Sequence, residues 1–271
     1  AHMMIRKIIY LGILLFALQS STVLAGSVGS ENLKEKQSSG TTTECFEGFS
    51  RAMFSFNHGL DTAVFEPIAK GYRTLPVPIR KGTGNLVDNL RSLLTISNNI
   101  LQGDFNQAGN TAGRFLINTT VGILGIFDPA SKMGFNENDK EDFGQTMAVW
   151  GTNSGCYFVL PLLGPTTVRD SVGLIGNVFL DPVYQITHNS EIKDGLAGNG
   201  NYSEHNYYYY RGTSSVDFRA KNIESFDSLE KNAIDFYASV KSIYLQDRAK
   251  KILNSESTVE TQDDSDWEEI E

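Results

Sequence analysis

Few side chains in this sequence have the types and spacing that catalysis requires. The sequence has four histidines, and none stands in a metal-binding spacing such as HExxH. The stretch Gly151–Gly155 resembles the turn that presents a serine nucleophile, but Asn153 occupies the nucleophile's position. A Walker A sequence and a complete dinucleotide-binding glycine motif are absent. We therefore predict that the protein is not an enzyme and that it needs neither a metal ion nor another cofactor.

The two cysteines, Cys45 and Cys156, lie far apart in the sequence and have no CxxC spacing and no neighbouring histidine pair. This pattern excludes a structural zinc site. An oxidising compartment would allow them to form a disulfide, although spacing alone does not bring their Cα atoms together. We expect two buried thiols and keep the disulfide as the alternative.

The composition is that of a folded protein. Of 271 residues, 40% are hydrophobic and 20% are charged, which excludes a disordered chain and a polytopic membrane protein. The net charge of −9 arises at the C-terminal end, where 254–271 contains eight acidic residues and no Lys or Arg. The rest of the chain has 23 basic and 24 acidic residues. Such a neutral body argues against nucleic-acid binding, and the acidic range 254–271 is predicted to be a disordered tail.

Residues 1–26 are predicted to be a cloning remnant followed by a secretory signal peptide. Arg6 and Lys7 precede the apolar run Ile8–Leu18, which is too short to span a bilayer. The following Leu24-Ala25-Gly26 resembles the residues before the lipidated cysteine of a bacterial lipoprotein, but position 27 is Ser27. A serine cannot carry the thioether-linked lipid. Either this is an unlipidated relative of lipoproteins, or Ser27 is an engineered replacement.

The body of the chain, 44–253, is predicted to be one all-α domain. The polar range before it, 27–43, is predicted to be either a flexible tether or only a disordered terminus. Apolar residues recur with helical spacing in Phe46–Val64, Asn85–Leu101 and Phe105–Phe127. The dipeptide Asp128-Pro129 predicts the start of a further short helix. Strand alternation of useful length is absent. Val216–Leu253 is predicted to be a helical pair that breaks near Ser242.

Several of these helices carry apolar residues beyond a single stripe, notably Phe115–Phe127 and Tyr157–Leu163. None reaches the roughly twenty residues needed to cross a bilayer. Such segments form either the core of a soluble domain or helices that lie at a membrane interface.

The segment Glu47–Asp61 (EGFSRAMFSFNHGLD) resembles the opening signature of the VacJ/MlaA lipoprotein family, EGFNR-x-MF-x-FN-x-x-LD. Further blocks follow in family order over 46–185, among them Asn98–Gly103, Arg114–Gly122 and Glu141–Thr146. The chain departs from the family pattern at Ser27, Ser50 and Cys156. The matched signature residues are Phe49, Arg51, Phe56, Asn57 and Asp61.

The resemblance implies a ring of amphipathic helices that lies flat in the periplasmic leaflet of the outer membrane around an amphipathic channel. Mislocalised phospholipids would leave the outer leaflet through this channel for a periplasmic carrier protein, and a trimeric porin would hold the ring. Nucleic acid is not an implied partner. The alternative function is a structural, porin-associated tether without lipid transfer.

Within such a ring, the polar-interrupted segment after Arg114 would suit a channel wall. The candidate channel residues are Arg114, Asn118, Thr119, Thr120, Gly122 and Gly125. Arg114 could bind a phosphate, or it could form a buried pair with an aspartate. The charged stretch Met133–Phe143 would be a loop that gates the pore, with Met133, Phe135, Asp142 and Phe143 as candidates, or only a solvated loop.

Overall fold

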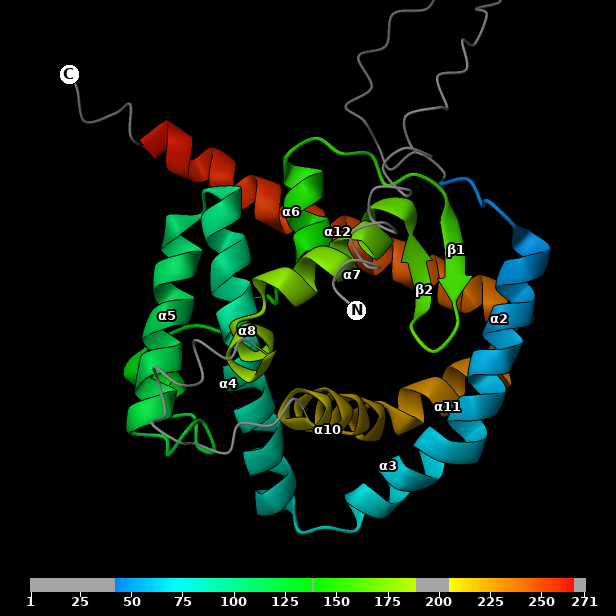
Figure 1. The fold of residues 1–271 in the computed structure, drawn as a ribbon, viewed down its shortest axis with the longest axis horizontal. Helices are drawn as coiled ribbons and strands as arrows, with labels where there is room; N and C mark the ends of the chain where they lie inside the picture. The colour runs from blue at the N-terminus through cyan, green and yellow to red at the C-terminus, as the bar shows by residue number, and fades with distance from the viewer. Residues whose placement is uncertain (1–41, 138, 189–204, 266–271) are drawn as a thin grey trace, which may run out of the picture. The chain divides into compact units, whose positions relative to one another are not determined.

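The computed structural model describes residues 42–137, 139–188 and 205–265. The predicted signal peptide, Ser27 and most of the predicted tether lie outside the described residues. The elements in chain order are α2 (Glu47–Leu60), the π-helical turn η1 (Asp61–Phe65), α3 (Glu66–Arg73), α4 (Val77–Gln102), α5 (Phe105–Thr120), the 3₁₀ turn η2 (Ala130–Met133), α6 (Phe143–Val149), β1 (Tyr157–Leu160), β2 (Gly164–Thr167), α7 (Val168–Leu180), α8 (Pro182–His188), α10 (His205–Lys221), α11 (Ile223–Asn232) and α12 (Phe236–Ser265). The prediction of a helical fold is confirmed (Figure 1).

Local sequence explains where several helices begin and end. Asp104 caps α5 by accepting a hydrogen bond from the backbone N–H of Gln107 at 3.0 Å. Gly103 ends α4 in the left-handed conformation, with φ of 82°. The helix α4 begins at Val77, earlier than the predicted Asn85, because Pro78 lies in its first turn, where a proline needs no hydrogen-bond donor.

The short helix predicted at Asp128-Pro129 is found as the 3₁₀ helix η2. Two other predictions for this fold were wrong. The C-terminal helices do not break near Ser242; the chain turns between α10 and α11 and again before Phe236, and α12 then runs without interruption to Ser265. The range 254–265, expected to be part of a disordered tail, is therefore helical.

A short antiparallel hairpin was also missed by the sequence analysis. Tyr157 pairs with Thr167, and Leu160 pairs with Gly164. The turn places Leu162 at a φ of 66° and Gly164 at 81°. Each strand has four residues and β2 contains a proline, so the pattern offered no readable alternation.

The expectation of two buried thiols was wrong, because Cys45 and Cys156 form a disulfide with their Cα atoms 5.4 Å apart. The chain before α2 runs beside β1, where Cys45 donates its N–H to the carbonyl of Tyr157 at 3.1 Å. The N–H of Tyr157 in turn reaches the carbonyl of Thr43 at 2.9 Å. This pairing brings the two cysteines together, and sequence spacing could not reveal it.

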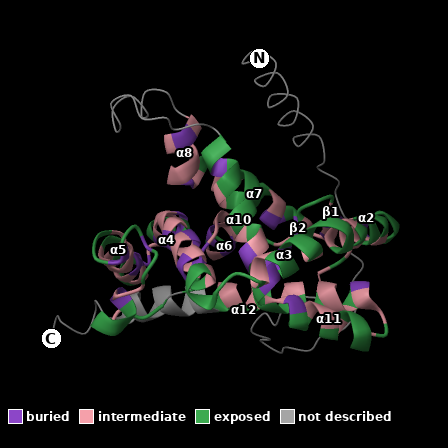
Figure 2. Ribbon diagram, turned by 90° about the horizontal axis from the view of Figure 1, so that it is seen from below, coloured by how far each residue is buried: buried purple, intermediate pink, exposed green. Residues whose placement is uncertain are grey.

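The described helices lie around an opening in Figure 1. In this view α2 and α3 lie on one side and α4 and α5 on the other, while α10 and the hairpin face each other across the opening. Buried residues are scattered over the elements in Figure 2 and do not gather at one centre. The two hydrophobic clusters are correspondingly small, one around Ala69 and one around Tyr157.

Large apolar side chains are exposed along several elements. They include Phe49 and Phe56 on α2, Ile123 and Leu124 in the loop after α5, Leu162 and Leu163 in the hairpin turn, and Ile175 and Phe179 on α7. Within 42–137, 139–188 and 205–265, none of the helices combines the length and the hydropathy that a membrane span needs. The exposed surface favours the interfacial interpretation of these helices over that of a closed core.

Candidate functional site

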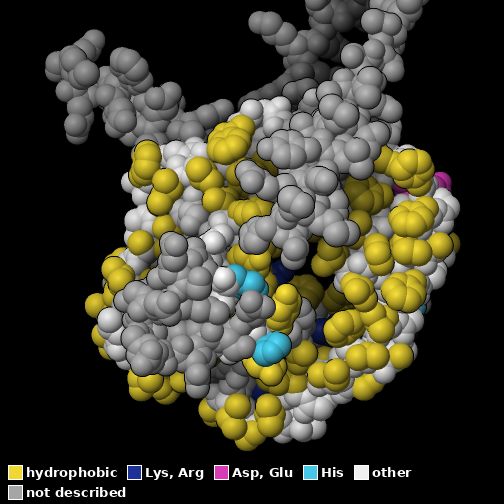
Figure 3. Space-filling view, in the orientation of Figure 1, with side chains coloured by type: hydrophobic (Ala, Val, Ile, Leu, Met, Phe, Trp, Pro, Cys, Tyr) yellow, Lys and Arg dark blue, Asp and Glu magenta, His cyan; other side chains and the backbone are white. Residues whose placement is uncertain are grey.

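A cavity of about 310 Å³ lies at the opening between α2, the hairpin and α10. In the space-filling view of Figure 3 the centre of this face is hollowed, with mostly hydrophobic walls and basic atoms at depth. The residues that line the cavity are Phe54, Asn57, His58, Leu60, Asp61, Phe65, Leu162, Leu163, Gly164, Pro165, Ser215, Phe218, Arg219, Phe226, Phe236 and Val240. Most of this surface is aromatic or aliphatic, and a few polar groups interrupt it, as is usual for sites that bind an amphipathic small molecule.

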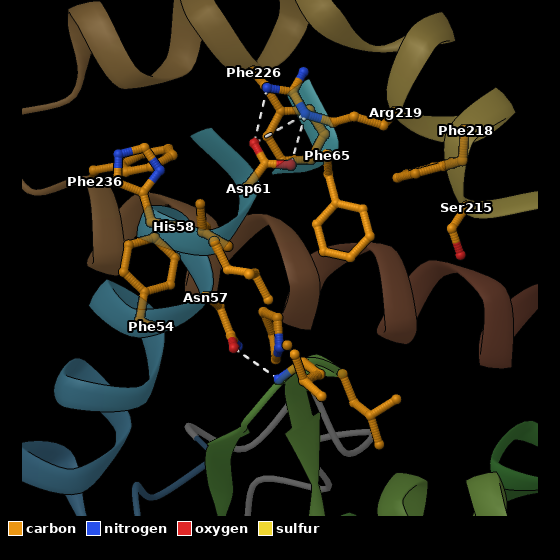
Figure 4. Close-up of a pocket in the computed structure, with 16 residues that line it drawn as sticks. Phe54, Asn57, His58, Asp61, Phe65, Ser215, Phe218, Arg219, Phe226 and Phe236 are labelled. Carbon is orange, nitrogen blue, oxygen red and sulfur yellow. Dashed lines mark hydrogen bonds and ion pairs between the residues drawn. The ribbon is translucent and has the colours of Figure 1, made fainter. Parts of the chain in front are cut away.

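Arg219 of α10 is the most deeply buried charge in this wall, with 8% of the residue exposed. Its Nε lies 3.0 Å from both carboxylate oxygens of Asp61, and its Nη2 lies 2.9 Å from Oδ2 (Figure 4). Its third nitrogen, Nη1, is buried and has no hydrogen-bond partner among the described residues. A buried donor without a partner is costly, so Nη1 marks a place where an added acceptor would be stabilised.

The surroundings of Arg219 keep it charged. Burial by itself lowers the pKa of Arg219, but the hydrogen bonds and charge of Asp61 outweigh burial and raise this pKa above its usual range. Glu66 adds a weaker ion pair at 3.7 Å. The guanidinium carbon also lies 4.9 Å from the ring centroid of Phe226.

Asn57 of α2 fastens the turn of the hairpin to the cavity wall. Its side-chain amide donates to the carbonyl of Leu160 at 2.8 Å, and its carbonyl accepts from the N–H of Leu162 at 2.7 Å. Both hydrogen-bonding ends of one side chain are thus used on one turn, which fixes the apolar residues Leu162 and Leu163 beside the cavity (Figure 4).

His58 lines the same wall one residue later. Its Nε2 lies 3.2 Å from Glu230 of α11, and its ring packs edge-on against Phe236 of α12 at 5.4 Å. These contacts join α2 to both C-terminal helices.

The signature residues of α2 divide into two groups. Phe49 and Phe56 are 51% and 52% exposed and do not line the cavity. Arg51 pairs with Asp235 at 2.9 Å and lies over the ring of Tyr237, 4.5 Å from its centroid. Arg51 therefore ties α2 to the start of α12. Together with Asn57 and Asp61 it connects α2 to the hairpin, to α10 and to α12, so the polar part of the signature holds the wall together.

The predicted channel residues on α5 lie elsewhere and do not line the described cavity. Arg114 donates to Asp128 at 3.0 Å and to the carbonyl of Phe135 at 2.6 Å, so it forms the Arg–Asp pair that was the alternative, while its role in a channel stays a prediction. Asn118 donates to the same aspartate at 2.8 Å and accepts from the N–H of Ala130 at 3.1 Å. This group of residues fixes the loop after α5 against that helix.

The remaining channel candidates lie at the end of α5 or in the loop that follows it. Thr119 accepts a hydrogen bond from Asn89 of α4 at 2.9 Å, and Thr120 bonds back to its own helix. A side chain at Gly122 would meet the carbonyl of Phe127 at 2.4 Å. Gly125 has a φ of 93° and lies against Asn89, so this turn requires glycine.

The predicted gating residues are held by several contacts. Phe135 packs on Gly113, while Met133 is exposed at the end of η2. Asp142 caps α6 by accepting from the N–H of Gln145. Phe143 packs on Gly176 and edge-on against Trp150, with ring centroids 5.7 Å apart. None of the four lines the described cavity, and their role as a gate stays a prediction.

The sequence analysis missed Arg219, Phe218 and Phe226, which lie on α10 and α11. One signal was available for Arg219: Asp61 belongs to the α2 signature, and a half-buried aspartate needs a cationic partner.

Comparison with known proteins agrees with this arrangement. The family model described as MlaA lipoprotein matches residues 42–251. An uncharacterised protein of Rickettsia prowazekii is 39% identical over 146 residues, which is 53% of this chain and 58% of that protein, less than two thirds of its length. The intermembrane phospholipid transport system lipoprotein MlaA of Haemophilus influenzae is 29% identical over 88% of this chain and 90% of its own.

A solved structure that concerns the maintenance of bacterial outer membrane lipid asymmetry superposes with a TM-score of 0.63 at 26% identity. The superposition covers 78% of this chain and 99% of that one. The resemblance found in the sequence is thereby confirmed. Because the family model covers well over half of the sequence, from the segment before α2 into α12, the chain belongs to the MlaA lipoprotein family.

Proposed function

We propose that this protein removes mislocalised phospholipids from the outer leaflet of the outer membrane and passes them to a periplasmic carrier. The observation that carries the proposal is the cavity, whose apolar wall contains one buried arginine with an unpartnered nitrogen. Two of its relatives' descriptions, intermembrane phospholipid transport and outer membrane lipid asymmetry, support this choice of ligand.

The chemistry of the wall suits a phospholipid. A phosphate oxygen at Nη1 of Arg219 would supply the missing acceptor in a charge-assisted hydrogen bond. The phenyl rings of Phe54, Phe65 and Phe218 would face the acyl chains. Because Asp61 already neutralises part of the guanidinium charge, the phosphate would be held weakly enough to leave again.

The protein is proposed to lie in the periplasmic leaflet of the outer membrane. Its exposed apolar residues on α2, on α7 and in the loop after α5 would rest among acyl chains, since no described helix can span a bilayer. A trimeric porin and a carrier protein of the same pathway are the partners that the family resemblance implies. Transfer would then follow differences in lipid affinity along the route and needs no hydrolysis.

The experiment is native mass spectrometry of the full-length protein extracted from outer membranes in mild detergent. We expect bound glycerophospholipid, and we expect Arg219→Gln to lower the bound fraction several-fold. Thr213→Ala, on the same helix but outside the cavity lining, is the matched control and should bind lipid normally. The same spectra show whether the N-terminus of the protein carries acyl chains, and so decide whether position 27 is lipidated.

A structural tether is the competing function. It predicts porin binding with no bound lipid, and no rise of glycerophospholipid in the outer leaflet when the protein is absent. Finding both results would overturn the proposed transport.

A further inference from the structure

The disulfide joins the end of the hairpin opposite its turn, here called the root, to the start of α2. Cys156 is the residue directly before β1, and Cys45 lies just before Glu47, where α2 begins. The bond therefore ties together two segments that are both part of the cavity wall, since α2 and the hairpin each contribute lining residues.

Besides the packing of Tyr157 against Tyr237 and Tyr244, the root is held by contacts of the segment before α2. Two backbone hydrogen bonds connect Thr43 and Cys45 to Tyr157. Glu44 is held by α12, where Lys241 lies 2.6 Å from its carboxylate and Tyr237 donates to it. The contacts of Thr43, Glu44 and Cys45 require the short, non-helical segment before α2 to stay in place.

The opposite end of the hairpin reaches the cavity. Leu162 and Leu163 of its turn line the cavity, and Leu162 is 67% exposed. Since the strands are only four residues long, a displacement of the root carries over to the turn, where Asn57 alone supplies the two side-chain hydrogen bonds described above.

Both cysteines are half-buried, and each has an exposed neighbour, Phe46 in one case and Gly155 in the other. Because neither cysteine is fully buried, we expect a small dithiol to reach the bond. The sequence departs from the family pattern at Cys156.

We propose that the Cys45–Cys156 disulfide is a redox-sensitive fastener that fixes the hairpin turn beside the cavity. A thiolate of a dithiol attacks one sulfur, forms a mixed disulfide and releases the other cysteine as a thiolate. The second thiol of the reagent then displaces the first cysteine. Overall the two cysteines gain two electrons and two protons, and the dithiol becomes a disulfide. The hairpin is then held by its hydrogen bonds and by the packing of Tyr157 and Val159 against α2 and α12, and its turn and the adjoining cavity wall become freer to move.

This inference rests on the proposed function only for its consequence, the retention of lipid; the fastening itself does not depend on it. The test is amide hydrogen exchange of the full-length protein in detergent, before and after treatment with dithiothreitol. We expect exchange in 157–167 to become at least tenfold faster after reduction, while exchange in α4 and α5 stays unchanged. The variant Cys45→Ser/Cys156→Ser should show the fast exchange without reagent and should not respond to it.

Unchanged exchange in 157–167 after complete reduction overturns the fastener, and so does an equal acceleration in all helices, because that result reports general destabilisation. Bound phospholipid is measured on the same samples by native mass spectrometry, and its fraction should fall several-fold on reduction. If the hairpin responds but lipid is absent in both states, the fastener stands and the transport proposal fails.

Discussion

Arg219 and Asp61 face each other in the cavity wall, with two nitrogens of the guanidinium bound to one carboxylate and the third left without a partner. The pair connects η1 to α10 across 158 positions of sequence. The nitrogens that face Asp61 stabilise the wall, and the remaining, buried nitrogen is the one that the proposed function assigns to a ligand.

Replacing Asp61 by Asn leaves the buried guanidinium of Arg219 with only its weaker ion pair to Glu66. Losing one partner of a buried pair costs about 3–5 kcal/mol of unfolding free energy. Urea unfolding of the detergent-solubilised protein measures this loss. Asp247→Asn is the matched control, because Asp247 forms a solvent-exposed pair with Lys251 one helical turn away, worth about 0.3–0.5 kcal/mol. Equal effects of the two substitutions would contradict the assigned role of Asp61.

Asn57→Ala should release the hairpin turn without unfolding the protein. It removes two hydrogen bonds, each worth about 0.5–1.5 kcal/mol. Hydrogen exchange should therefore accelerate at Leu160 and Leu162, with little change in α4. Asn85→Ala is the control, since Asn85 donates its amide to the carbonyl of Ile126, away from the cavity. Slow exchange in the turn of the Asn57→Ala protein would show that other contacts hold the hairpin.

Acid should destabilise the protein through Asp170. Burial raises the pKa of this carboxyl, but the charge and hydrogen bonds of Arg248 outweigh burial and hold the pKa below its ordinary value of 3.8. Because the folded-state pKa is the lower one, the stabilisation is complete above about pH 4 and is lost as the pH falls through the folded-state pKa. Unfolding free energies measured between pH 2 and pH 6 should show this loss. Asp170→Asn should weaken the dependence, and an identical pH profile would exclude Asp170 as its source.

For Asp181 we expect the unfolding free energy to depend on pH in the opposite direction. Burial raises its pKa, although the N–H of Val183 donates to it at 2.9 Å and opposes that effect. A raised folded-state pKa makes the charged form a cost at neutral pH, and this cost disappears as the pH falls through that pKa. Asn caps helices as well as Asp does, so Asp181→Asn should keep α8 and raise the unfolding free energy at pH 7. A lower free energy for the variant would contradict this reasoning.

Helical periodicity predicted the helices near Phe46–Val64 and Asn85–Leu101 because their apolar stripes are long enough to be read. The sequence analysis missed the hairpin because each strand has only four residues and β2 contains a proline. It missed the disulfide because no local pattern encodes the pairing of the segment before α2 with β1. The sequence analysis did not predict the helical end of α12, because an acidic composition is compatible with helix as well as with disorder.

The cavity could not be predicted from spacing, because its lining comes from segments spread between Phe54 and Val240. Arg114 was chosen as a charge within an apolar run, yet Asp128 lies close enough in the fold to pair with it. Arg219 has no such local context. Its partner Asp61 lies in the signature of α2, so a search for the cation that neutralises this aspartate was the available route.

The cavity wall depends on contacts between α2 or η1 and segments that follow much later in the chain. From α2, Asn57 donates to a carbonyl 103 positions away and Arg51 donates to a carboxylate 184 positions away. Asp61 of η1 accepts from a guanidinium 158 positions away. Contacts over such separations are slow to form, since most of the chain must be ordered before they stabilise anything. A partly synthesised chain that stops before α10 therefore lacks Ser215, Phe218 and Arg219, and with them part of the cavity wall.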